Sequence, residues 1–159
     1  MPDSIRETIM KLVKTRLETI TIANSYVNTV LSVQRFTQSG QTYASVPMIV
    51  VHEGDDVPTD GPLAGAVSLT SRTVDLALEL VIRHNESTDA RSSEEVMNTL
   101  RTDVEKAVMT DRTWSGYALD TSALTYSPVF VEEGQPDVSS FAEMRIAYRH
   151  RATDPSQLV

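Results

Sequence analysis

The sequence contains no cysteine, which excludes thiol catalysis, thiolate metal sites and disulfide bonds. It also lacks any apolar run near the roughly 18 to 20 residues that a membrane-spanning helix needs. The N-terminal stretch MPDSIRETIMKLVKTR has no uninterrupted apolar segment of the kind found in secretory signals. Hydrophobic residues make up 40% and charged residues 23%, as in globular rather than disordered chains. We therefore expect one soluble domain over residues 1–159, with no membrane contact.

Catalytic patterns are also missing. The sequence has no HExxH motif and no GxSxG elbow, and its six glycines are too scattered for a phosphate-binding loop. Glu132 and Glu133 would face opposite sides of a strand, so they could not cooperate as acid and base. His52 and the acidic residues within 53–56 could hold a cation, but a solvated strand end is the stronger interpretation. We predict no catalytic residue, cofactor or metal site, and hence a protein that is not an enzyme.

The charge balance is acidic, with 22 Asp and Glu against 14 Lys and Arg and a net charge of −8. This argues against a grip on nucleic acid by the whole protein. Near the C-terminus, however, MRIAYRHR (144–151) alternates apolar residues with arginines, which is typical of a strand with one buried face. Its positive face could form a charge ladder on an outer sheet face, a seam between subunits, or a nucleic-acid patch. The third is disfavoured because interleaved exposed aromatic residues are missing.

Two helices are predicted from apolar residues at helical spacing, one over about 4–20 and one over about 93–110. Each opens with a capping-box pattern, Ser4 with Glu7 and Ser92 with Glu95. Asp3 is an alternative cap for the first helix. These start signals indicate amphipathic helices that cover one face of a sheet.

Five strands are predicted from β-branched and alternating segments, at 29–36, 47–53, 73–84, 121–132 and 138–150. The Gly-, Pro- and Asp-rich stretch 54–70 is interpreted as a long loop, and residues 152–159 as a short polar C-terminal tail. The order is therefore α-β-β-β-α-β-β. Consecutive strands without helical crossovers predict an α+β fold, with a mainly antiparallel sheet and two principal helices packed on one face.

Candidate contact residues follow from this layout. A turn near 134–135 would place Arg149 opposite Thr121 and diagonal to Asp120, while Asp75 and Glu79 lie on the polar face of strand 73–84. The predicted subunit-interface residues are Asp75, Glu79, Arg145, Arg149 and Arg151. Trp114, the only tryptophan, either lies in an interface or folds back over the end of the second helix. The predicted partner-contact residues are Asp55, Asp56, Asp60, Leu63 and Trp114.

Several stretches, taken in order, resemble the tail terminator proteins of long-tailed bacteriophages, also called minor tail or tail completion proteins. They are SIRETIMKLVKTRLETI, VNTVLSVQRF with VPMIVVHEGDD, SSEEVMNTLRTDVEKAVMTDRTWSGYALD, and VFVEEG with FAEMRIAYRHRATDP. The resemblance spans nearly the whole chain and rests on the order of elements rather than on one diagnostic motif.

The resemblance implies a virion protein at the neck end of the tail. Such proteins form a homohexameric ring on the last ring of the major tail (tube) protein, stop polymerisation and present a surface to the head–tail connector or neck. Genomic DNA passes through the ring without specific binding. A head-completion or neck protein is the nearest alternative, and a small ligand-binding domain or enzyme a remote one.

Overall fold

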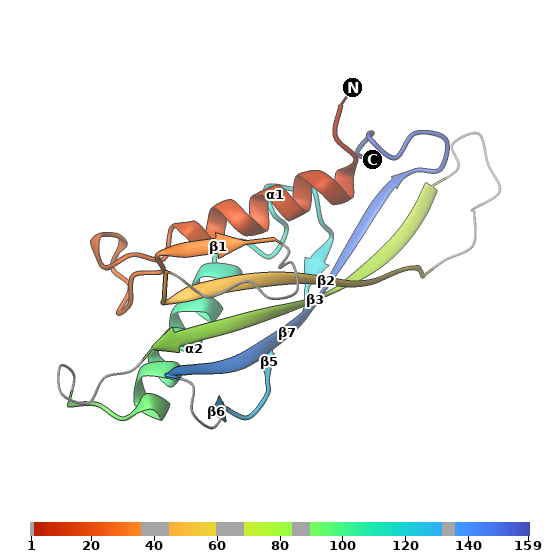
Figure 1. Ribbon diagram of the computed structural model, residues 1–159. Helices are drawn as coiled ribbons and strands as arrows, with labels where there is room; N and C mark the ends of the chain where they lie inside the picture. The colour runs from red at the N-terminus through yellow and green to blue at the C-terminus, as the bar shows by residue number, and fades with distance from the viewer. Residues whose placement is uncertain (1, 36–44, 60–68, 84–89, 132–135) are drawn as a thin grey trace.

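The computed structural model describes residues 2–35, 45–59, 69–83, 90–131 and 136–159, which form an α+β fold with a mostly antiparallel sheet (Figure 1). Its elements are α1 (Ile5–Glu18), the short 3-10 helix η1 (Ile22–Asn24), β1 (Ser32–Gln34), β2 (Met48–Pro58), β3 (Leu69–Arg83), α2 (Ser93–Met109), β4 (Asp120–Thr121), β5 (Thr125–Tyr126), β6 (Phe130–Val131) and β7 (Asp137–Arg151). The predicted fold class and element order are confirmed.

The sheet is built around two long strands, β3 and β7, which pair along their whole length (Figure 1). β2 pairs antiparallel with the other edge of β3, and the short β1 adds in parallel to β2. β4, β5 and β6 pair with successive parts of the remaining edge of β7. The sheet order is therefore β1-β2-β3-β7, followed by three short pieces.

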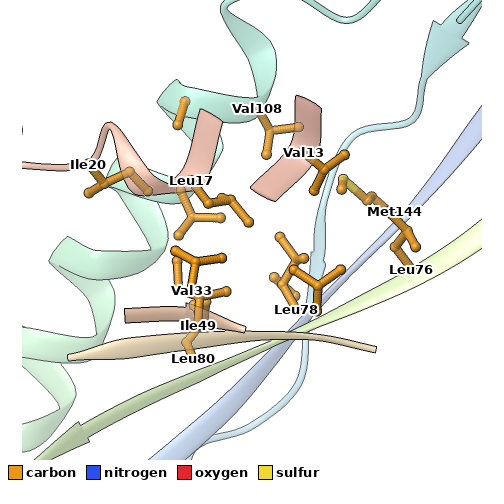
Figure 2. Close-up of a cluster of buried hydrophobic side chains, with 14 of the residues drawn as sticks. Val13, Leu17, Ile20, Val33, Ile49, Leu76, Leu78, Leu80, Val108 and Met144 are labelled. Atoms are coloured by element: carbon orange, nitrogen blue, oxygen red, sulfur yellow. The ribbon is translucent and has the colours of Figure 1, made fainter. Parts of the chain in front are cut away.

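Both helices pack on one face of this sheet, because alternate strand residues are apolar and buried. On β3 these are Leu76, Leu78 and Leu80, and on β7 Met144 and Ile146 are their counterparts. Figure 2 shows the three leucines and Met144 in one cluster with Val13 and Leu17 of α1 and Val108 of α2. Burial of apolar area is the main stabilising contribution to such a fold.

The helix start signals are confirmed. Ser92 with Glu95 forms a complete capping box. At the first helix only half of the box forms: the Ser4 side chain accepts a hydrogen bond from the Glu7 backbone, but the Glu7 side chain bonds Arg35 instead. Asp3 is not the cap, since its carboxylate pairs with Lys11 at 2.6 Å. Local sequence therefore determines where each helix begins, because an N-cap satisfies amides that have no partner within the helix.

The predicted loop at 54–70 is wrong at both ends. β2 continues to Pro58 and β3 begins at Leu69, so only the part between them remains, and residues 60–68 lie outside the described residues. An irregularity between Glu53 and Asp56 lets β2 pass its Gly- and Asp-rich stretch and resume pairing with β3. Such bulges are tolerated at sheet edges, as is Pro58. Pairing with β3 overrides the local turn signals.

The predicted strand 121–132 is also wrong as a continuous element. Between β4 and β5, four residue steps on this edge (Thr121 to Thr125) lie opposite three steps on β7, so one extra residue is accommodated. The same one-residue insertion occurs between β5 and β6. At each break the backbone and side chain of a serine take over the hydrogen bonds that the regular strand pairing would make. Ser122 donates its N–H to the Arg145 carbonyl and accepts the Arg145 N–H with its hydroxyl.

Ser127 repeats this arrangement with Phe141. Serine hydroxyls compete with backbone groups in this way, and alternation of residue types does not reveal it. The predicted register is wrong for Thr121 for the same reason, since Thr121 lies opposite Ile146 rather than Arg149. Asp120 lies opposite Ala147, so Arg149 remains its diagonal neighbour.

The C-terminal residues fold back against the start of α1. Arg151 and Asp154 form an isolated bridge, and the carbonyl of Pro155 accepts the N–H of Ile5 at 2.9 Å. The two ends of the chain consequently lie close together (Figure 1). The polar tail predicted at 152–159 is thus a structured turn that covers a free helix amide.

Candidate interaction surface

The sheet face turned away from α1 and α2 is called the outer face here. It carries the odd-numbered residues of β3 and β7, including Ala77, Glu143 and Arg145, because side chains alternate along a strand. Among the described residues, neither helix packs on this face. All five predicted subunit-interface residues lie on it, although the register that suggested them was partly wrong.

Three of those five residues already have partners within the chain. Arg145 donates to Asp75 directly across the strands, with Nε–Oδ1 at 2.7 Å, and the hydrogen bond from Arg145 lowers the pKa of Asp75. Glu79 contacts His52 at 2.8 Å from Nε2 to Oε2. This is the charge ladder considered from the sequence. Their role in a subunit interface stays a prediction.

The other two, Arg149 and Arg151, are exposed. Within the described parts of the chain neither makes an ion pair. Arg149 donates only to the Ser71 hydroxyl, at 3.0 Å. Hydrogen bonds from Ser156 lower the pKa of Asp154, and the electrostatic attraction of Arg151 adds to this effect. The outer face therefore ends in two arginines that hold no close ion pair with any described carboxylate.

Two exposed carboxylates, Asp55 and Glu143, lie on the outer face next to the paired residues. In the segments that the structure describes, neither has a hydrogen-bond or ion-pair partner. Glu143 was not among the residues predicted from the sequence. Its place in FAEMRIAYRHR, two residues before Arg145, was enough to put it on the same strand face as the arginines. Asp55 was predicted as a partner contact, but within a loop rather than on a strand.

Asp55 and Glu143 line a shallow hollow of about 590 Å³ that crosses the outer face from β2 to the segment after β4. Its lining includes small residues, Gly54, Ala77 and Ala123, which leave the space open. The Asp75–Arg145 pair borders it. The hollow thus combines free carboxylates with room for a long side chain.

Asp56 points to the opposite side of the sheet. Its carboxylate accepts hydrogen bonds from Arg72 Nε and the Tyr148 hydroxyl, both at 2.8 Å. Arg6 Nε of α1 lies 3.1 Å from Asp56 Oδ2, close enough for an ion pair but without the alignment of a hydrogen bond. Burial, followed by the bond to Asp56, raises the pKa of Tyr148. Asp56 therefore ties α1 to the sheet and is not free for a partner.

Arg35 extends the same network. Its guanidinium bonds Glu7 of α1 at 2.7 Å and Glu53 of β2 at 2.6 Å, and Glu53 also pairs with Arg6 at 2.8 Å. The hydrogen bond from Arg35 lowers the pKa of Glu7. Charges on the helix side are therefore matched with one another.

The Trp114 side chain is buried, with 0% exposure. Its indole N–H donates to the Thr121 hydroxyl at 2.8 Å, and the Arg16 guanidinium lies over the ring, 5.5 Å from its centre. Of the two alternatives, packing after the second helix is correct, and the partner-contact prediction for Trp114 is not. Asp60 and Leu63, the remaining predicted contacts, lie outside the described residues.

No group of three or more His, Asp or Glu side chains among the described residues is placed to hold a metal ion. His52, the histidine in the possible cation grouping, instead contacts Glu79. No helix in the described ranges is both long and apolar enough to cross a membrane.

Fold and surface together define an α+β protein with one sheet face covered by the helices and an outer face that is charged along β3 and β7 and buried around Met48, Val50 and Val81. A scan of protein-family models found no match for this chain, and a search of curated proteins found no significant match. The functional argument therefore rests on the residues themselves.

Proposed function

We propose that this chain is a structural virion protein that resembles phage tail terminators and forms a homohexameric ring on the end of the tail tube. The supporting observation is two sets of exposed, oppositely charged groups on the outer face. Among the described residues, Arg149 and Arg151 make no ion pair with a carboxylate, and Asp55 and Glu143 make none with a basic group. Unpaired charges of both signs suit a surface that docks on a copy of itself.

A ring requires unlike surfaces to meet, because each copy contacts its two neighbours through different patches. Separate basic and acidic patches meet this requirement. In the proposed assembly one rim of the ring stops addition of the major tail protein, and the other receives the neck or connector. With a net charge of −8, the chain suits a channel through which genomic DNA passes without being held.

Tail assembly in the absence and presence of this chain tests the proposal. The major tail protein would be assembled with the wild-type chain or without it, and the tubes measured by electron microscopy. We expect overlong tubes without the chain, and with it, short tubes that carry six-fold rings at one end.

Two other outcomes would contradict the terminator proposal. Tubes of normal length that fail to join heads would instead identify a head-completion or neck protein. A chain that leaves tube length and head joining unchanged would count against both.

A further inference from the structure

We propose that copies of this chain meet through the outer face, with Arg149 and Arg151 of one copy entering the hollow beside Asp55 and Glu143 of the next. This inference rests on the proposed function, since it specifies the contact within the ring. The proposed occupant of the hollow is thus a second copy of the same chain, chosen by complementary charge.

Among the described charged residues of the outer face, these four are the ones that make no ion pair. Asp75 and Arg145 neutralise each other within the chain, and the Glu79 carboxylate is engaged by His52. Once these pairs are set aside, the described part of the outer face retains two carboxylates near the hollow and two guanidinium groups farther along β7. Since Glu79 has further contacts, the Asp75–Arg145 pair is the clearer example of this internal matching.

Distance excludes pairing of these free groups within one chain. Six residues separate Glu143 from Arg149 on β7, which corresponds to roughly 20 Å at the rise of an extended strand. An arginine side chain cannot bridge that span. Ion pairs between Arg149 and Glu143 must therefore join two copies, and each copy offers both a basic and an acidic patch.

The shape of the hollow fits the same occupant. Ala77 lies opposite Glu143 across the strands, so a short side chain stands beside the free carboxylate. At Gly54 a Cβ atom would come within 3.1 Å of the Asp75 carbonyl, so the chain there lies close against β3. The resulting space suits an arginine, whose planar guanidinium can bind a carboxylate with two hydrogen bonds.

Cysteine cross-linking tests this contact cleanly, because the natural chain has no cysteine. Two single variants, Arg149→Cys and Glu143→Cys, would be mixed at high protein concentration and treated with a short bismaleimide. We expect linked pairs that contain one copy of each variant. The matched control replaces Glu143→Cys with Glu94→Cys, an exposed acidic position at the start of α2, and should link several-fold less.

Charge reversal provides a second measurement. The R149E/R151E variant and the D55K/E143K variant should each lose self-association in sedimentation at low salt, while a mixture of the two restores it. Circular dichroism establishes that each variant folds. Cross-linking no greater than in the control, preferential linking of Arg149→Cys to itself, or failure of the mixed variants to associate would overturn the contact.

The contact and the function can fail separately. If cross-links are absent but tubes still carry six-fold rings of this chain, the contact is wrong and the terminator function stands. If the cross-links form but the chain closes into two-fold dimers and leaves tubes overlong, the contact stands and the ring function is wrong. A wild-type chain that stays monomeric at high concentration, with no cross-links, overturns the contact.

Discussion

On the helix side of the sheet, Asp56 accepts hydrogen bonds from Arg72 and Tyr148, whereas its neighbour Asp55 has no partner on the outer side among the described residues. The two carboxylates are adjacent in sequence. They point to opposite faces of the sheet, at an irregularity in the pairing of β2 with β3. The comparison teaches that charge serves two purposes here. Matched charges hold α1 to the sheet, and unmatched ones remain available for another molecule.

The largest expected difference between the two faces concerns Leu78, which is fully buried on the helix side. Leu78→Ala should lower the free energy of unfolding by about 2 to 5 kcal/mol, because it removes apolar contacts and leaves a cavity. Urea unfolding measures this loss. The control Glu143→Gln, on the outer face, should change stability by less than about 0.5 kcal/mol. Equal effects would contradict the division between the faces.

A sharper comparison uses the neighbouring carboxylates. Asp56→Asn should cost about 1 to 3 kcal/mol of unfolding free energy, because it weakens bonds to Arg72 and Tyr148 and removes one of the two carboxylates that pair with Arg6. Asp55→Asn is the matched control, with an expected change below about 0.5 kcal/mol. The urea unfolding midpoints of the two variants measure this difference in stability. A larger loss at Asp55 would mean that the assignment of the two sides is reversed.

The turn that seats Trp114 gives a smaller effect with a defined pH dependence. Asp111 accepts hydrogen bonds from the Thr113 side chain and the Ser115 amide, and these bonds lower its pKa from 3.8 to about 2. A lowered folded-state pKa stabilises the fold above pH 3.8, and this contribution is lost as the pH falls through about 2.

Asp111→Asn should therefore cost about 1 kcal/mol near neutral pH, the usual net value of a hydrogen bond. Because the asparagine does not titrate, the difference from wild type should shrink as the pH is lowered from 4 to 2. Urea unfolding across this range provides the measurement. A difference that is independent of pH would show that the carboxylate charge is not involved.

The smallest effect is expected at the Asp75–Arg145 pair, which is exposed and screened by solvent. Arg145→Ala should produce a slight loss of stability that disappears at high salt. The lowered pKa of Asp75 means that this loss should also fade as the pH drops below the ordinary range of an aspartate. Thermal unfolding at low and high salt tests it, with Arg149→Ala as the unpaired control. A salt-independent loss would indicate a packing role instead.

Much of the fold was predictable because its signals are local. The caps at Ser4 and Ser92 satisfy amides within three residues, and the alternation in β3 and β7 reflects a buried and an exposed face. These signals do not depend on the rest of the chain. The same alternation identified Arg145, Arg149 and Arg151 as one face.

The remainder depended on pairing between distant segments. Ser122 and Ser127 interrupt the edge strand because their hydroxyls accept hydrogen bonds from amides of β7. Trp114 is buried in the hydrophobic core, where its indole N–H donates to Thr121 on a strand that pairs with β7. Neither partner can be recognised from the neighbouring sequence. Sequence reasoning therefore misplaced the register and left the role of Trp114 open between two alternatives.

The sequence by itself determined the two helices, the long alternating strands and the acidic balance, since each follows from local periodicity or from composition. Only the tertiary structure decided that Asp55 faces outward and Asp56 inward, that Asp75 and Arg145 satisfy each other, and that Glu143 has no partner in the described segments. The physical reason is that side-chain partners come from strands far apart in the chain, and their register is set by irregularities that local patterns do not encode.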